Sequence, residues 1–235
     1  MAKRGTGGPK RRRTAQPSRV DAAYEALKAA IRDNRLAPGH QASEQELADR
    51  LGMSRTPVHE AVIRLQEEGL VRVLARRGVL VRALSPEDMR EIYEVIVALE
   101  SAAAAGIAAQ PAPAREAAAQ ALAAENDAMG AALAADDLPA WAAADGRFHE
   151  LLVARCGNAR LARLLGTVMD QSHRARMLTL RLRPRPLRSV EEHRAIIAAI
   201  RAGDGAAAAA LAGAHRRRAQ EELLPLLGTL GMRHL

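Results

Sequence analysis

Cysteine, aromatic residues and long apolar runs are all scarce in this chain of 235 residues. The single cysteine, Cys156, excludes an intrachain disulfide framework. Aromatic residues make up 2% of the chain and hydrophobic residues 49%, so the core must consist mainly of Ala, Leu, Val and Ile. No apolar run approaches the roughly 20 residues of a membrane span, and the N-terminal segment lacks the apolar stretch of a signal peptide. These features predict a cytoplasmic protein with no membrane partner.

Sequence motifs of the common nucleotide-binding and hydrolytic folds are also missing. The chain has no phosphate-binding loop, no glycine fingerprint for a dinucleotide and no G-x-S-x-G elbow. Alanine runs such as 102–105 and 206–210 instead favour helices.

The net charge of +8 is distributed unevenly. Residues 1–19 carry seven basic side chains and no acidic one, and the rest of the chain is nearly neutral. This segment is rich in Gly, Pro and Arg, so we expect a disordered basic tail. Such a tail could add salt-dependent affinity for phosphates, or could serve only as a solubilising extension.

Two short helix patterns lie between Ser43 and Leu70 and predict a helix-turn-helix. Gly52 allows a tight turn between them, and Ser54 is placed to cap the second helix, with Pro57 in its first turn. The second helix has one apolar stripe at helical spacing, formed by Val58, Ala61, Val62 and Leu65. This stripe leaves Arg55, Thr56 and His59 on an outward face near the helix start, where a recognition helix presents side chains to the major groove.

The flanking segments complete a winged helix. Residues 20–34 have the stripe of a helix, and two short apolar runs, 70–74 and 79–82, are joined by a basic turn. The two runs predict a β-hairpin that forms the wing. We expect the main DNA contacts from Arg55 and Thr56, and supporting contacts from His59, Gln45, Arg77 and Gly78.

The remainder of the chain reads as helix throughout. Ser85 can cap a helix that begins at Pro86, and we expect helices at 86–109, 113–135, 137–156, 158–182, 189–202 and 204–229. The predicted fold is therefore mainly α, with a winged helix-turn-helix at 20–84 and an all-α bundle of six helices for effector binding and dimerisation at 85–235.

Four side chains in the helical part form a candidate metal site. Asp145 and His149 are four residues apart and share one helix face, while His193 and His215 lie on apolar sides of two later helices. Three imidazoles and one carboxylate suit a divalent ion such as Zn²⁺ inside a bundle. Taken singly, a histidine on an apolar stripe is more often a hydrogen-bonded core residue. We expect the other histidines, His40, His173 and His234, on the surface or in loops.

Both halves of the chain resemble one family. The motif SEQELADRLGMSRTPVHEAVIRLQEEGLV, followed by RGVLV, resembles the winged helix of GntR-type bacterial transcription regulators. Glu100 in IVALESAAAAGIAA, the segments ADGRFHELLVARCGN and SVEEHRAIIAAIRAGD, and His215 resemble the ligand-binding FCD domain of the FadR subfamily. Six helices rather than seven suggest the VanR-like branch.

The resemblance implies a homodimer that binds a pseudo-palindromic DNA operator, at the bacterial nucleoid when bound. It implies a metal, Zn first and Ni or Mn as alternatives, held by Asp145, His149, His193 and His215. A small carboxylic acid would bind beside the metal and move the two DNA-binding heads. Such regulators are mostly repressors of nearby catabolic genes that a pathway metabolite releases from DNA.

Two positions depart from the family pattern. His59 stands where the recognition helix usually has Arg, and an imidazole cannot bind guanine through two donors as arginine does. Ile96 stands where an Arg usually faces the ligand, so the carboxylate clamp must come from elsewhere. Arg174 or Arg176 could supply it.

Two other hypotheses remain open at this point. In one, the metal is purely structural or is itself the signal. In the other, the chain is a metal-dependent hydrolase with a DNA-binding appendage. Zinc proteases place a glutamate between paired histidines, whereas residues 146–148 here are Gly, Arg and Phe, which counts against the hydrolase.

Overall fold

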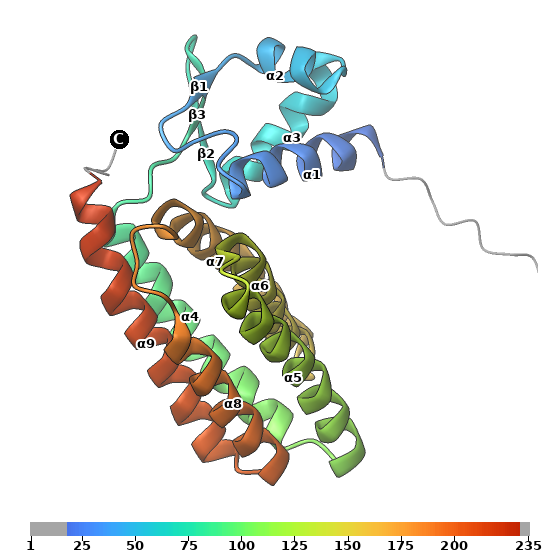
Figure 1. The fold of residues 1–235 in the computed structure, drawn as a ribbon. Coiled ribbons are helices and arrows are strands. Elements are labelled where there is room, and N and C mark those ends of the chain that lie inside the picture. Colours follow the sequence, from blue (N-terminus) through green and yellow to red (C-terminus); the bar gives the residue numbers. More distant parts are fainter. Residues whose placement is uncertain (1–17, 231–235) are drawn as a thin grey trace, which may run out of the picture.

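A winged helix sits at one end of an elongated helical bundle in the computed structural model, which describes residues 18–230 (Figure 1). The predicted tail, 1–19, lies almost wholly outside the described residues, as does His234. The winged helix comprises α1 (Arg19–Arg32), β1 (Gln41–Ala42), α2 (Glu44–Leu51), α3 (Arg55–Glu67), β2 (Val71–Leu74) and β3 (Gly78–Val81). The bundle comprises α4 (Pro86–Ala108), α5 (Ala112–Ala134), α6 (Leu138–Ala154), α7 (Ala159–Thr179), α8 (Leu187–Ala202) and α9 (Gly205–Thr229). The predicted fold class is confirmed.

The helix-turn-helix forms where the sequence places it. Ser43 begins α2 with a reciprocal cap, because its hydroxyl accepts from the backbone N–H of Glu46 and the Glu46 carboxylate accepts from the backbone N–H of Ser43. Gly52 ends α2 in the left-handed conformation, at φ +62°, which glycine adopts without steric cost. Ser54 stands at the N-cap of α3 as predicted, but its side chain makes no capping hydrogen bond.

The wing is an antiparallel hairpin of β2 and β3, paired from Val71 with Val81 to Leu74 with Gly78. The structure adds a strand that the sequence did not predict, since the two-residue β1 pairs with the other edge of β3. A strand of two residues is too short to show an alternating pattern.

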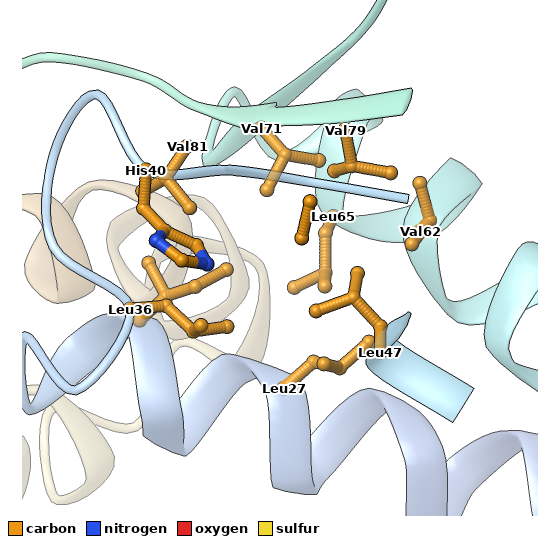
Figure 2. A pocket seen from close by; sticks show the side chains of 11 residues that line it. Leu27, Leu36, His40, Leu47, Val62, Leu65, Val71, Val79 and Val81 are labelled. Carbon is orange, nitrogen blue, oxygen red and sulfur yellow. The ribbon is translucent and has the colours of Figure 1, made fainter. Parts of the chain in front are cut away.

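Apolar side chains from α1, α2, α3 and the sheet meet in the core of the winged helix (Figure 2). The gap at their centre is about 10 Å³, too small for a bound molecule. His40 lies beside this gap with its ring turned inward, and its Nε2 is buried without a hydrogen-bond partner. His40 lies in the loop between α1 and β1, as predicted, but it is half-buried, because the chain turns back at Pro38 and Gly39 to begin β1.

All six predicted bundle helices are present, with ends within a few residues of those expected. Helices α4 and α9 run side by side along the length of the bundle, α8 packs against both α9 and α5, and α5 pairs with α6 (Figure 1). Ser85 caps α4 by accepting from the backbone N–H of Asp88, as predicted. Within the described range, no helix is both long and apolar enough to cross a membrane.

Helix α7 packs against the winged helix, and its side chains contact α1, the residue that follows α3 and the linker. Gln171 donates to the carbonyl of Glu68 at 3.4 Å, and Arg174 donates through Nη2 to the carbonyl of Arg82 at 2.8 Å. The hairpin and α2 point away from this junction, so the outer end of the winged helix is open (Figure 1).

Candidate functional site

The predicted DNA-contacting side chains lie on the open surface of the winged helix. The side chains of Arg55 and His59 are 68% and 54% exposed, and Thr56 beside them is exposed as well. Gln45 on α2 is exposed and donates to Asp49 at 2.8 Å. These four side chains come from the two helices of the helix-turn-helix, which is the arrangement that the sequence predicted.

A buried carboxylate, Glu44, holds two of these side chains and was missed in the sequence. Its residue is 9% exposed, and it accepts from Arg55 Nε at 3.0 Å while lying 2.7 Å from His59 Nδ1. Burial raises the pKa of Glu44, but the hydrogen bonds from His59 and Arg55 outweigh it, so the pKa lies below its ordinary value. Periodicity could not reveal this contact, because it joins residues of two helices across a turn.

The wing carries Arg77 at its exposed tip, where Gln41 Nε2 donates to the Arg77 carbonyl at 2.6 Å. Gly78 follows at φ +88°, and a Cβ there would lie 2.4 Å from the carbonyl oxygen of Ala42. Glycine at 78 is therefore required by the close approach of β1, whatever its role toward DNA.

The four predicted metal ligands come together in the bundle. Asp145 and His149 lie on α6, His193 on α8 and His215 on α9, and one ligand atom from each lies within 4.8 Å of all the others. All four side chains are buried. His193 Nε2 is 3.1 Å from His215 Nε2, and the ring of His193 stacks at 3.8 Å on Phe148, the only phenylalanine of the chain.

Carboxylates behind the rings orient two of the histidines. His215 Nδ1 donates to Glu192 Oε2 at 2.8 Å, and Arg218 holds the same carboxylate. His149 Nδ1 lies 3.1 Å from Glu100 Oε2, without good hydrogen-bond geometry, and Glu100 forms a two-bond pair with Arg216 at 2.6 and 2.5 Å. Such carboxylate–histidine pairs are typical around metal-ligating imidazoles, because they turn the opposite nitrogen toward the ion.

The rings are held in the neutral form that a metal requires. Burial lowers the pKa of His215 to about 4, and burial likewise lowers the pKa of His149 and of His193. Both ring nitrogens of His149 and Nδ1 of His193 are buried without a hydrogen-bond partner. Buried nitrogen lone pairs without donors are costly unless something binds them, and a divalent ion would satisfy those that face the centre of the cluster.

The three residues predicted for effector binding separate in the structure. Arg176 pairs with Asp145 and lines the cavity beside the cluster. Arg174 is fully buried at the junction with the winged helix, and Ile96 is fully buried in an apolar cluster, so neither lines that cavity. Arg174 therefore lies at the junction with the winged helix and away from the cavity beside the cluster.

The structure instead brings Arg183 to the cavity. Its Nε donates to Thr179 Oγ1 at 3.0 Å and its Nη2 is buried without a partner. No carboxylate in the described part of the chain pairs with Arg183, although Arg176, Arg216 and Arg218, which also line the cavity, each have one. The basic run RLRPRPLR, which leads from the end of α7 into α8, is the sequence signal for it.

Comparison with known proteins identifies matches for both parts. The family of bacterial regulatory proteins called gntR matches residues 19–81, and the FCD domain matches residues 91–218. An uncharacterized HTH-type transcriptional regulator of Agrobacterium vitis, from the TAR-I ttuE-ttuC' intergenic region, is 57% identical over 136 residues, which is 58% of this chain and 80% of that protein.

Two further matches cover most of the chain. An uncharacterized HTH-type transcriptional regulator in an unstable DNA locus of Streptomyces ambofaciens is 30% identical over 182 residues, 77% of this chain and 75% of that protein. The crystal structure of a GntR transcriptional regulator from Rhodococcus sp. RHA1 covers 89% of this chain and 99% of its own, with a TM-score of 0.73 and 26% identity.

Proposed function

Because this chain belongs to the GntR family and carries an FCD domain, it is a DNA-binding transcription regulator, and we propose that a small organic acid bound beside a metal ion controls it. Its relatives are transcription regulators rather than enzymes, which removes the hydrolase hypothesis. The observation that carries the proposal is the buried Asp145, His149, His193 and His215 cluster beside an arginine that lacks a carboxylate partner.

The output of this regulator is the winged helix. Two copies in a homodimer bind a pseudo-palindromic operator, and α3 of each copy enters the major groove with Arg55 and Thr56 toward the bases. Gln45, His59 and the wing residues Arg77 and Gly78 assist. Their open placement at the end away from the bundle supports this role (Figure 1). Repression is the proposed direction, in line with most regulators that this chain resembles.

The input begins with a divalent ion held by Asp145, His149, His193 and His215, with Zn²⁺ ahead of Ni²⁺ or Mn²⁺. Nitrogen-rich ligand sets of this kind suit Zn²⁺. An ion bound there supplies a Lewis acid for a carboxylate oxygen of the effector. Glu192 accepts a hydrogen bond from His215, and Arg176 pairs with Asp145. These contacts keep the ligand atoms of His215 and Asp145 directed toward the centre of the four-residue cluster.

The effector enters the adjoining cavity and pairs with Arg183. A carboxylate accepts charge-assisted hydrogen bonds from a guanidinium, and the free Nη2 of Arg183 can donate one. The cavity is only about 30 Å³, room for about one water, so an organic acid requires a side chain to move. Arg183 lies in the connection between α7 and α8, outside either helix, so it is the side chain that can yield with least disturbance.

Helix α7 is the proposed link from input to output. It carries Arg176, which pairs with the metal-site residue Asp145, and Arg174, which donates to the linker carbonyl of Arg82. A displacement of α7 on effector binding therefore changes how the winged helix is seated on the bundle. This is a mechanical connection through one helix whose two sides contact the two sites.

Metal analysis followed by thermal unfolding tests the input. We expect one divalent ion per chain after purification, and none in the variants His193→Ala and Asp145→Ala. Wild-type protein should gain several degrees of melting temperature with a matching carboxylic acid from a panel, and chelator should abolish this gain. The variant Arg183→Met should keep the metal and lose the gain. If the carboxylic acid still raises the melting temperature after the metal is removed, the metal does not anchor the effector. If the protein binds a metal but no acid raises its melting temperature, the metal is structural or is itself the signal.

A further inference from the structure

We propose that Glu44 fixes the neutral ring of His59 with its proton on Nδ1, so that Nε2 reaches the major groove as an acceptor and selects adenine or cytosine. This inference rests on the proposed entry of α3 into the major groove. It concerns the position where the family usually has an arginine, and it gives that departure a chemical consequence.

Glu44 is placed to direct two reading side chains at once. One carboxylate oxygen, Oε2, accepts from Arg55 Nε at 3.0 Å, and the other, Oε1, lies 2.7 Å from His59 Nδ1. The Glu44 side chain is 10% exposed, while Arg55 and His59 are mostly exposed, so the acid is a buried support beneath two outward side chains.

The proton position on His59 follows from the charge of Glu44. The two hydrogen bonds keep the pKa of Glu44 below its ordinary value, so the group is an ionised carboxylate at neutral pH. An ionised carboxylate can only accept. His59 Nδ1 must therefore carry the hydrogen, and in the neutral ring Nε2 then has a lone pair and no hydrogen.

Nothing in the described residues hydrogen-bonds to His59 Nε2, and the side chain is 54% exposed. A lone-pair acceptor on this face needs a donor from the base edge. In the major groove, adenine N6 and cytosine N4 carry the donors, whereas guanine presents only the acceptors O6 and N7. Guanine opposite neutral His59 would bring two acceptors together, and is therefore disfavoured.

Arg55 has the opposite preference. Its Nε is engaged by Glu44, which leaves the two terminal nitrogens free as a pair of donors for guanine. His59 follows four residues later, about 6 Å along α3, and so faces a neighbouring base pair. Each half-site is thus expected to combine one guanine with an amine-bearing base, where an arginine at 59 would require a second guanine.

Selection from a library of random duplexes at pH 8 tests this. The full chain and its variant His59→Arg are each used to select duplexes under identical salt. We expect one base pair of the half-site to change from adenine or cytosine in the wild type to guanine in the variant, with the other positions unchanged. Binding to matched duplexes should differ about fivefold or more at that position.

Two further variants separate the effect of the His59 tautomer from the effect of removing one negative charge. Glu44→Gln offers an amide that can accept or donate, so His59 regains both tautomers. The preference for adenine or cytosine over guanine at that base pair should then nearly disappear. Glu60→Gln, the matched control, removes the same charge from the exposed neighbour of His59 and should strengthen binding to all duplexes without changing the preference. Circular dichroism checks that both variants fold, and if Glu44→Gln does not, the wild-type and His59→Arg selections still decide.

The outcomes distinguish this inference from the proposed function. If wild-type protein selects guanine at the position that His59→Arg alters or leaves unchanged, the acceptor role of Nε2 is refuted while α3 remains in the groove. If no position responds to His59→Arg and Arg55→Ala retains specific binding, the placement of α3 is itself wrong.

Discussion

Acid should destabilise the metal-free protein through its buried histidines. Burial lowers the pKa of His215 from 6.5 to about 4, so between these values the unfolded chain binds a proton that the folded chain excludes. The free energy of unfolding therefore falls as pH falls through this window. At about 1.4 kcal/mol per pH unit, His215 alone removes about 3 kcal/mol by pH 4. His149 and His193 are shifted in the same direction.

Urea unfolding measures this loss between pH 7.5 and 4.5 in protein freed of metal by chelator. Trp141 is the only tryptophan, is buried and lines the cavity, so its fluorescence reports on the relevant region. The acids behind the rings do not contribute in this window, because the pKa of Glu192 is lowered to about 2 and its effect begins below about pH 4.5.

The control is His215→Asn, which keeps a polar side chain that does not titrate. Wild-type protein should lose about 2 kcal/mol more than this variant across the pH range. Equal losses in the two proteins would show that His215 is solvated or already protonated, and would refute the neutral cluster.

Three further predictions concern the other residues. Arg55→Ala should weaken specific operator binding at least tenfold and leave salt-dependent binding to unrelated DNA nearly unchanged in a gel-shift assay, and equal weakening of both would count against base reading. Arg183→Met should weaken the response to an organic acid about tenfold in a thermal-shift titration without loss of metal, and an unchanged response would place the carboxylate elsewhere. Gly78→Ala should lower stability by about 2 kcal/mol in urea unfolding, because the new Cβ meets the Ala42 carbonyl at a positive φ, and a neutral result would mean that β1 is free to shift.

The sequence predicted the helices well because their apolar stripes and end signals are local. Gly52 and Ser85, for example, end and begin helices by chemistry that involves only their neighbours. The sequence also pointed to the four residues of the candidate metal site, since these histidines and this aspartate lie on apolar helix faces. Their convergence needed the structure, because His215 is far along the chain from Asp145.

The sequence could not show which side chains from different elements contact each other. Glu44 joins α2 to α3, and Arg183 comes from a connection without periodicity. Helix geometry could, however, have shown that Arg174 and Arg176 do not face the same site. Residues two apart on a helix point in nearly opposite directions, at about 100° per residue, so only one of them could face the cavity. Arg176 faces it, and Arg174 faces the junction.

Operator release shows whether the buried cluster of Asp145, His149, His193 and His215 controls DNA binding. Metal-loaded protein is bound to a labelled duplex of the intergenic DNA beside its gene, and fluorescence anisotropy is followed as carboxylic acids are added. We expect one of these acids to release the wild-type protein, whereas His193→Ala binds the duplex with similar affinity but is not released. Release of wild type and His193→Ala by the same acid at the same concentration would contradict the claim that the buried cluster is the input.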